Sequence, residues 1–538
     1  MGGYYNERAL SAAQNEDRRL SVTHVMNRRT LLAGTAALGL GATLAPDAMA
    51  QAAAPALKGG KPLRVALLAD FVNYDPHQFS SQNAIVMRNL YDTLIEYDDA
   101  GKPVPALAQS FQIAPDNMSV TIVLRQGVTF HSGAALTSAD LDATLKKAND
   151  PRTGKNVFPT MSPVQDWTVV DDKTVRLNFK QKVPDKQVTD LLQFMFVIAK
   201  DTVDSAETKV NGTGPFTVAE RVLGQRLRLA ANPKYWRAKQ PILSEVVFTV
   251  FSDNESAAAA LESKAVDMIF GGGARQAVRL RTAGFQLHQG QGQLVQVLRI
   301  NTTRAPFDNE KFRQAFNYLI DRAAILRVGY AGLGEVTALP WAPANPAADR
   351  SYDKTYAFDI AKGQALLKQS GLTAAQMSDW KLLVNGGDQD SVAISQVVQN
   401  ALKRAGIDIQ LELKQGSEYV DALLGGKFNA TFGGVGNVQK FPTRVTTNSI
   451  YRVVNNPVLG NPNPHKAYVE AIERVNSAFG TADIKAAYGA LNKALVDSSF
   501  GIATNTYDVF ITVAAKNVGG FTKDIDSLLV LRTVGFTS

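Results

Sequence analysis

A change of hydrophobic pattern between Gln293 and Asp321 marks the part of the chain on which the predicted organisation depends. Apolar side chains dominate from Leu294 to Ile300, which is typical of a strand buried on both faces of a sheet. Pro306 ends this strand, Asp308 can cap a helix, and apolar residues then recur at helical spacing from Phe312 to Ile320. The pattern fits either an ordinary strand–helix junction inside one domain or the passage of the chain from one globular body into another.

Strand and helix patterns alternate along most of the chain, which predicts α/β layers around a mixed sheet. Leu63 to Ala69 has the pattern of a buried strand, and a helix is expected to end near Tyr91. Residues 95–183 differ, because short strands and hairpin turns predominate there and predict a small α+β insertion. Residues 309–494 are mainly helical, and a strand pattern returns at 501–513.

One helix is expected within the insertion. Thr137 or Ser138 is suited to cap its first turn. Leu141 and Leu145 are four residues apart, so they should face inward together.

The length of 538 residues exceeds the size at which single cores usually divide, so two or three folding units are expected. The composition, 45% hydrophobic and 20% charged, is ordinary for a soluble globular protein. The formal net charge is +8, but no block of lysine and arginine occurs, so we expect no nucleic-acid binding. The chain has no cysteine, which excludes disulfides, thiolate metal ligands and a lipid-modified cysteine.

Residues 1–50 have the pattern of an export signal preceded by extra N-terminal residues. The pair Arg28-Arg29 precedes an uncharged run that reaches Ala45, and this run is too short to span a membrane. Ala48-Met49-Ala50 places small residues where a signal peptidase reads them, so cleavage is expected after about Ala50. The arginine pair favours the twin-arginine pathway, with a general secretory signal as the alternative.

The rest of the N-terminal region follows from this prediction. Met26 is an alternative start, since residues 1–25 are polar and precede the signal. Residues 51–61 are rich in Ala, Gly and Pro and are expected to be a flexible N-terminus. The mature protein is expected to be soluble and periplasmic.

Sequence patterns of catalysis are absent. The chain contains neither a Gly-x-Ser-x-Gly nucleophile elbow nor a Walker phosphate loop. Its histidines show no spacing that predicts a metal site, and they are His24, His77, His131, His288 and His465. We therefore expect a protein without cofactor, metal or enzymatic activity. A secreted hydrolase is the alternative, which turnover would reveal.

Several short motifs follow one another in a recognisable order. They are Leu90–Leu94 (LYDTL), Pro105–Ala108 (PALA), Leu124–Gly133 (LRQGVTFHSG), Gly212–Phe216 (GTGPF), Asn232–Trp236 (NPKYW), Arg313–Phe316 (RQAF) and Ile320–Arg322 (IDR). In order and spacing the chain resembles the family 5 extracellular solute-binding proteins of ABC importers. That family includes periplasmic oligopeptide-, dipeptide- and nickel-binding proteins, and the resemblance covers nearly all of residues 60–536.

The resemblance implies an α/β fold of the two-lobed periplasmic-binding-protein type (class II, cluster C), with an α+β subdomain inserted in lobe one. Lobe one would comprise residues 62–95, 201–298 and 500–538. The inserted subdomain would comprise residues 96–200 and lobe two residues 299–499. The strand at 293–301 would then be one crossing between the lobes.

The resemblance also implies a function. The protein would be a monomer that captures a small organic solute, a peptide or peptide-like compound by family default. It would deliver that solute to the transmembrane subunits of an ABC permease. A sensory protein that presents its solute to a chemoreceptor is an alternative.

Candidate ligand-binding residues lie in loops at strand ends, where clefts are usually lined. Phe71, Asn73 and Tyr74 are the candidates in lobe one, and Trp341, in a proline-rich loop, is one in lobe two. Core packing is the alternative for each aromatic residue.

The segment 428–457 supplies the remaining candidates, which are Phe432, Asn437, Arg444 and Tyr451. Peptide-binding members of the family carry an Ala-Asp-Tyr-x-Asp-Pro pattern here, whose aspartate holds the ligand's α-ammonium group. This segment contains no acidic residue and instead has Lys440, Arg444 and Arg452. Because arginine favours carboxylates, the alternative ligand is an anionic non-peptide such as an opine or a carboxylated compound. Solvated surface is the other interpretation of these cations.

Export should depend on the arginine pair. Replacing Arg28 and Arg29 together by lysine keeps the charge but removes the guanidinium groups, so the precursor should accumulate in the cytoplasm, as immunoblots of cell fractions would show. The same replacement at Arg18 and Arg19, which precede the signal, should leave export unchanged. Normal export in a strain without the twin-arginine translocase would show that the pathway assignment is wrong.

Overall fold

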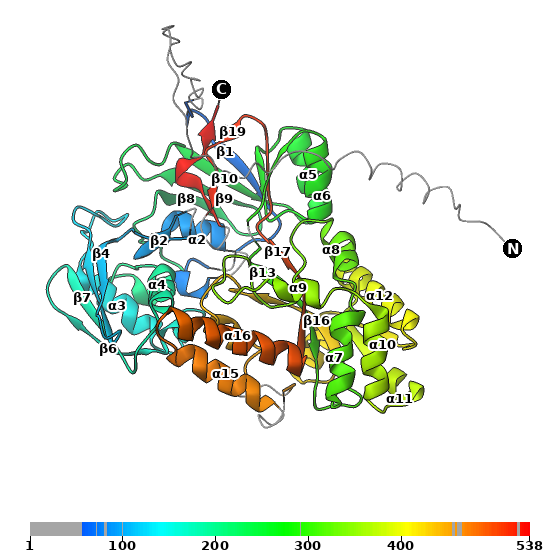
Figure 1. The fold of residues 1–538 in the computed structure, drawn as a ribbon. Helices are drawn as coiled ribbons and strands as arrows, with labels where there is room; N and C mark the ends of the chain where they lie inside the picture. Colours follow the sequence, from blue (N-terminus) through cyan, green and yellow to red (C-terminus); the bar gives the residue numbers. More distant parts are fainter. Residues whose placement is uncertain are drawn as a thin grey trace, which may run out of the picture. The chain divides into compact units, whose positions relative to one another are not determined.

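The computed structural model describes residues 56–71, 73–79, 83–98, 101–290, 292–453, 458–459, 465–523 and 528–537. The export signal expected at 1–50 lies outside the described residues. Within them, three bodies can be distinguished, which we call lobe one, the inserted subdomain and lobe two (Figure 1).

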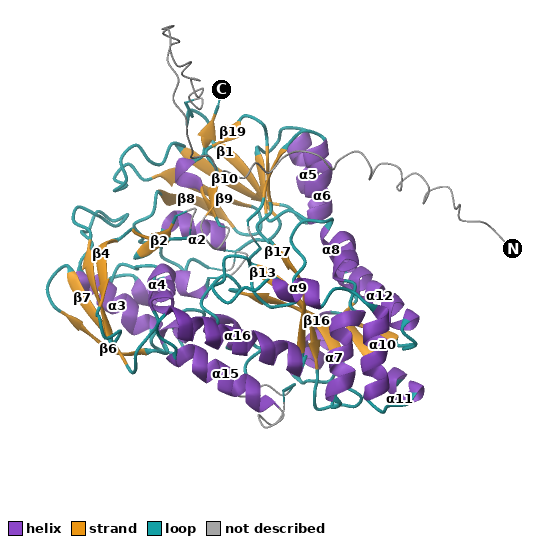
Figure 2. Ribbon diagram, viewed as in Figure 1, coloured by secondary structure: helices purple, strands orange, loops and turns teal. Residues whose placement is uncertain are grey.

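Lobe one is built on a seven-stranded mixed sheet with the strand order β12-β18-β11-β1-β10-β9-β8. Its strands are β1 (Leu63–Leu67), β8 (Phe216–Val222), β9 (Arg226–Ala231), β10 (Glu245–Val250), β11 (Met268–Phe270), β12 (Gln286–His288) and β18 (Thr512–Ala514). The central strand β1 runs parallel to β10 and β11. Helices α2 (Ala84–Leu90), α5 (Asn254–Glu262) and α6 (Ala274–Thr282) complete this lobe (Figure 2).

The strand β1 shows why the sheet is buried on both faces. Leu63 and Val65 are fully buried and pack in the core that includes helix α2. Ala66, the residue that follows Val65, packs in a second core that includes α5 and α6. A continuous apolar run is therefore needed here, as the sequence predicts.

The inserted subdomain contains a four-stranded antiparallel sheet with the order β4-β5-β7-β6. Its elements are the hairpin β2 (Ile95–Tyr97) and β3 (Pro103–Pro105), the strands β4 (Ala108–Ile113), β5 (Ser119–Leu124), β6 (Val164–Val169) and β7 (Thr174–Phe179), and the helices α3 (Ser138–Ala148) and α4 (Asp185–Phe194). Thr137 caps α3 in a capping box with Asp140, and Leu141 and Leu145 are buried, as expected.

Lobe two is built on a five-stranded sheet with the order β15-β14-β16-β13-β17. Its strands are β13 (Leu294–Ile300), β14 (Lys381–Asn385), β15 (Gln410–Lys414), β16 (Ala430–Gly436) and β17 (Gly501–Tyr507). Its helices are α7 (Glu310–Leu319), α8 (Arg322–Tyr330), α9 (Ser351–Thr355), α10 (Ile360–Gln369), α11 (Ala374–Ser378), α12 (Gln389–Arg404), α13 (Gly416–Leu424), α14 (Thr443–Thr446), α15 (Lys466–Ser477) and α16 (Thr481–Ser498). The N-cap of α7 is Asn309, which accepts from the Phe312 backbone N–H, and not Asp308 as expected.

The end of the chain returns to lobe one and forms two small antiparallel pairs. These are β19 (Val518–Gly519) with β22 (Gly535–Phe536), and β20 (Thr522–Lys523) with β21 (Leu529–Val530). Three short 3-10 helices, η1 (Pro76–Gln78), η2 (Phe158–Met161) and η3 (Val203–Ser205), occur earlier, and η5 (Leu531–Thr533) lies in this tail.

The strands place the crossings between the lobes differently from the boundaries expected at residues 298 and 500. Strand β13 pairs along its length with β16, and β17 pairs antiparallel with β13, so both belong to the sheet of lobe two. The crossings therefore lie just before Leu294 and just after Tyr507. A strand that pairs on both sides within one sheet cannot be the connection itself.

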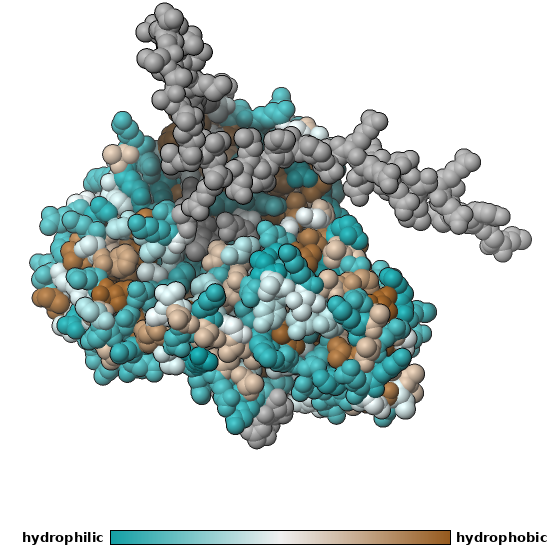
Figure 3. Space-filling model, viewed as in Figure 1, coloured by the Kyte–Doolittle hydropathy of each residue, from teal (hydrophilic) through white to brown (hydrophobic). Residues whose placement is uncertain are grey.

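The surface of the face seen in Figure 3 is mostly hydrophilic, with apolar residues scattered among the polar ones. Over the part of the chain that the structure describes, no helix combines the length and apolar character needed to cross a bilayer.

His77 makes stability depend on pH. It is fully buried, and burial together with the nearby Lys147 ammonium lowers its pKa to about 3. The unfolded chain takes up this proton near pH 6.5, so the unfolded state binds more protons between about pH 6.5 and 3, and stability falls as the pH drops through that window. Replacing His77 with leucine should flatten the pH dependence of the unfolding free energy by about 1.4 kcal/mol per pH unit, measured by denaturant titration.

The half-buried His288 offers a comparison. Burial and the Lys523 ammonium also lower its pKa, but His288 is less buried than His77. His288→Gln should flatten the same curve less. Equal slopes for the wild type and His77→Leu would contradict the assignment.

Candidate functional site

A cavity of about 410 Å³ draws its walls from all three bodies. Lobe one contributes Phe79, Val509 and Phe510; the inserted subdomain contributes Lys155, Asn156, Pro159 and Phe194; lobe two and the segment before it contribute Gln293, Leu294, Gly436, Asn437, Gln439, Arg444, Thr447 and Asn448. A molecule in this cavity would touch both lobes at once. Its volume lies in the range of small-molecule sites.

Two other hollows do not draw on both lobes, since one lies within lobe two and the other between lobe one and the inserted subdomain. A groove of about 420 Å³ lies in lobe two beside Trp380 and Lys427. A cavity of about 200 Å³ is lined by Asp92, Glu96 and residues of the C-terminal tail. Glu96 in that cavity pairs with both Arg237 and Arg532, so the Glu96 carboxylate already has counter-charges within the protein.

The wall from lobe two begins where β16 ends at Gly436. Asn437 has a positive φ of 60°, a backbone conformation that asparagine tolerates better than most residues, and it turns the chain away from the sheet. Pro442 then starts the short helix α14, which carries Arg444. The Arg444 guanidinium lies 4.9 Å from the centre of the Phe194 ring across the cavity wall.

Contacts between lobe one and the inserted subdomain hold another part of the cavity wall. The Asn156 side chain donates to the Phe79 carbonyl at 2.7 Å, and its backbone N–H donates to the His77 carbonyl at 3.1 Å. The Phe79 ring meets the Phe194 ring edge-on at 6.3 Å. Lys155 precedes Asn156 with a positive φ of 45° and is exposed at the rim.

Helix α4 joins the inserted subdomain to lobe two through buried polar contacts. The Lys440 ammonium donates to the Gln193 side-chain oxygen at 2.8 Å, and Lys440 is fully buried. The Phe441 backbone N–H donates to the Asp190 carboxylate at 2.7 Å. The other Asp190 oxygen accepts from the Tyr97 hydroxyl at 3.0 Å and pairs with Lys186.

The charge of the cavity is positive. Lys155 and Arg444 are its ionisable lining residues, and among the described lining residues none is acidic. Side-chain amides supply most of the remaining polar groups, and three phenylalanine rings supply apolar area. Such a lining can orient a small organic molecule that carries a negative group.

Of the predicted site residues, Asn437 and Arg444 line the cavity. Phe71 and Tyr74 instead pack in the lobe-one core, 5.3 Å apart between ring centres, and the Arg221 guanidinium lies over both rings. The Asn73 side chain is used locally, since it bonds Gln78 and accepts from the Asp75 backbone N–H. For these three residues the structure favours packing and turn formation over the expected role.

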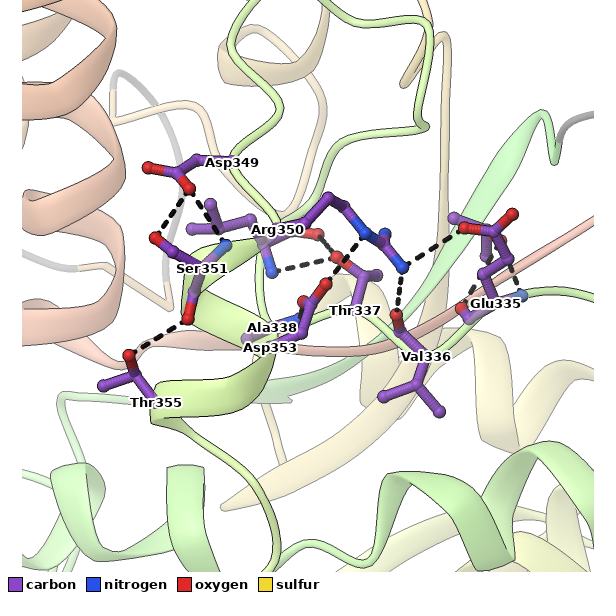
Figure 4. A network of polar contacts seen from close by, with 11 residues as sticks. Glu335, Val336, Thr337, Ala338, Asp349, Arg350, Ser351, Asp353 and Thr355 are labelled. Carbon is purple, nitrogen blue, oxygen red and sulfur yellow. Dashed lines mark hydrogen bonds and ion pairs between the residues drawn. The ribbon is translucent and has the colours of Figure 1, made fainter. Parts of the chain in front are cut away.

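Trp341 is 1% exposed and lies in a core of lobe two, where its indole N–H donates to Asn492 at 2.7 Å. The polar network of Figure 4 fixes the segment before it, because Arg350 pairs with Glu335 and Asp353. The expected loop exists, but the ring points into the core because its area is buried most completely there.

Phe432 and Tyr451 are also buried. Phe432 belongs to the core beside α7, and the Tyr451 ring meets the Phe500 ring edge-on at 5.7 Å. Burial raises the pKa of Tyr451, and its hydroxyl donates to the Gly501 carbonyl. Sequence reasoning missed Phe79, Phe194, Phe510 and Lys155, and no local motif marks any of them.

The matches to known proteins agree with this architecture. The model of the family "Bacterial extracellular solute-binding proteins, family 5 Middle" matches residues 102–451. The glutathione-binding protein GsiB of Salmonella typhimurium is 28% identical over 344 residues, which are 62% of this chain and 65% of that protein. The match thus spans just under two thirds of this curated relative.

Two solved structures share the fold. The binding protein AgaA of A. tumefaciens R10, in complex with agropinic acid, has a TM-score of 0.73 at 22% identity and covers 88% of this chain and 99% of its own. The binding protein DppA of Helicobacter pylori, in complex with the peptide STSA, has a TM-score of 0.73 at 21% identity and covers 90% and 99%. Both likenesses support the two-lobed periplasmic-binding-protein fold.

The buried contact at Lys440 should favour the closed arrangement of the lobes. Replacing Lys440 with methionine keeps the apolar stem but removes the charged hydrogen bond to Gln193, a bond of a kind worth about 1.5–3 kcal/mol. The ligand-free variant should therefore open more often than the wild type, seen as a larger radius of gyration in small-angle X-ray scattering.

Lys466→Met is the control, because that side chain is 78% exposed on α15. It should leave the scattering unchanged. A Lys440→Met variant that folds and scatters like the wild type would show that this contact does not hold the lobes together.

Proposed function

Since the chain belongs to family 5 of the bacterial extracellular solute-binding proteins, we propose that it is the solute-binding component of an ABC importer. It captures a small organic solute between its lobes in the periplasm and passes it to the transmembrane subunits of the permease. The observation that carries this proposal is the cavity of about 410 Å³ whose walls come from both lobes and the inserted subdomain. It binds its solute without chemical turnover.

A solute in this position stabilises the closed form because it contacts both lobes together. A ligand shifts a conformational equilibrium only by its difference in affinity for the two states, and an open form would offer it one wall instead of two. The lobes would rotate about the segments just before Leu294 and just after Tyr507, as in hinge closure around a ligand. The permease would then distinguish the loaded protein by its closed shape.

The range of solutes is set by the lining. Asn437 and Arg444 are the site residues that we retain from the sequence, with Phe79, Phe194 and Phe510 as the apolar contacts. Named relatives bind glutathione, a peptide or agropinic acid, which are all organic molecules with several polar groups. The amide-rich and aromatic lining supports a solute of that general kind, a peptide-like compound by family default.

A thermal-shift screen over peptides, opines, sugars and organic acids tests the function. A ligand at about 100 times its dissociation constant should raise the unfolding free energy by about 2.7 kcal/mol. The same ligand should reduce the radius of gyration in scattering and should be recovered chemically intact after incubation. Conversion of the bound compound into a product, or stabilisation by a saturating ligand without any closure, would contradict the proposal.

A further inference from the structure

We infer that the interlobe cavity selects a solute with a carboxylate or a similar oxyanion, held between Arg444 and Lys155, and does not hold the ammonium group of a peptide. This inference rests on the proposed function, because it assigns the chemistry of the same cavity. It decides between the peptide-like ligand and the anionic ligand that the sequence left open.

The first argument is the sign of the charge. Arg444 of lobe two and Lys155 of the inserted subdomain both line the cavity. No acidic side chain accompanies them among the lining residues described. Closing the lobes on a neutral or cationic solute would bring two positive charges nearer to each other and to that solute, whereas an anion between them is attracted by both.

The second argument concerns Arg444 itself. It is half-buried, and its guanidinium lies 4.9 Å from the centre of the Phe194 ring. The face of an aromatic ring attracts a guanidinium, and the N–H groups of a guanidinium lie in its own plane. That geometry suits the two parallel hydrogen bonds that arginine makes with a carboxylate.

The third argument is that the buried carboxylate of α4, the helix that carries Phe194, is already used. Asp190 is 3% exposed and accepts from the Phe441 backbone N–H and the Tyr97 hydroxyl, and it pairs with Lys186. These contacts join α4 to lobe two, so Asp190 cannot turn to a ligand's ammonium without breaking them. An ammonium group in the cavity would therefore lack a counter-charge among the described lining residues.

The rest of the lining supports the body of such a solute. Asn437, Gln439 and Asn448 can each donate or accept hydrogen bonds. Phe79, Phe194 and Phe510 can cover apolar carbon atoms. An organic acid with additional hydroxyl, amide or carbonyl groups matches this combination.

The test compares acids with their own neutral amides. The probe is a library of small carboxylic acids, the matching primary amides, and zwitterionic dipeptides, tested on the full mature protein by thermal shift and then by calorimetry. Acids should stabilise the protein. Their amides should bind at least about tenfold more weakly, since a charged hydrogen bond is lost. The dipeptides should bind at least about tenfold more weakly as well, since their ammonium group has no counter-charge in the described lining. The affinity for acids should also fall when salt is raised from about 0.01 M to about 0.15 M, because the Debye length shrinks from about 30 Å to about 8 Å.

Variants assign the effect to the two cations. For the acid that binds best, Arg444→Gln should weaken binding by about 30-fold or more, and Lys155→Gln by a smaller factor because Lys155 is exposed. Arg444→Lys should fall between the wild type and Arg444→Gln, since it keeps the charge but not the paired N–H groups. Unchanged melting of the ligand-free variants shows that the fold is intact.

Matched controls exist elsewhere on the surface. Arg327→Gln removes an exposed arginine of α8, and Lys239→Gln removes an exposed lysine that shares the positive φ of Lys155. Neither residue lines the cavity, so both variants should bind the acid like the wild type.

The outcomes separate the two proposals. Amides or dipeptides that bind as tightly as acids, or an Arg444→Gln variant within about threefold of the wild type, would overturn the anion assignment and leave solute binding intact. No stabilisation by any compound of the broader screen would count against the proposed function itself.

Discussion

The antiparallel pairing of β13 with β17 is the constraint on which the arrangement of the lobes depends. Leu294 lies opposite Tyr507 and Arg299 opposite Gly501, so the strand that brings the chain into lobe two is the neighbour of the strand that takes it out. Both connections to lobe one therefore leave the same end of the same sheet. Two adjacent connections permit the lobes to rotate about them, whereas the backbone pairing keeps each lobe rigid.

A short segment of lobe two carries two cations in different surroundings. Lys440 is fully buried against Gln193 and near the Tyr97 and Phe194 rings, where its charge has the partners that a buried ammonium needs. Arg444, four residues later, faces the cavity. The same stretch thus contacts the inserted subdomain and lines the cavity, so a solute bound there, as we propose, would be coupled to the position of lobe two.

Large aromatic residues are divided between the core and the cavity by how much of each ring can be covered. Phe307, Phe312, Phe316 and Trp380 form one cluster in lobe two, with the Phe307 and Trp380 ring centres 4.7 Å apart. Trp341 and Tyr451 are likewise buried and also satisfy their polar atoms internally. The cavity is lined by Phe79 and Phe510 of lobe one and by Phe194 of the inserted subdomain, and these rings come together only in the folded protein.

The elements could be predicted from the sequence because local periodicity reflects local physics, whereas the two-lobed class followed from the family resemblance that the order of the motifs carries. The strand at 294–300, the helix that buries Leu141 and Leu145, and the α+β insertion all follow from spacing along a few residues. The positive segment around Arg444 was also visible as a run without acidic residues.

What only the tertiary structure decided is which side chains share a space. Lys155 and Arg444 are 289 positions apart in sequence, and their approach to one cavity depends on α4, on the crossings beside β13 and β17, and on the burial of Lys440. Burial also separated Trp341 from the cavity, because the area that a ring can cover is a property of the packed fold and not of its neighbours along the chain.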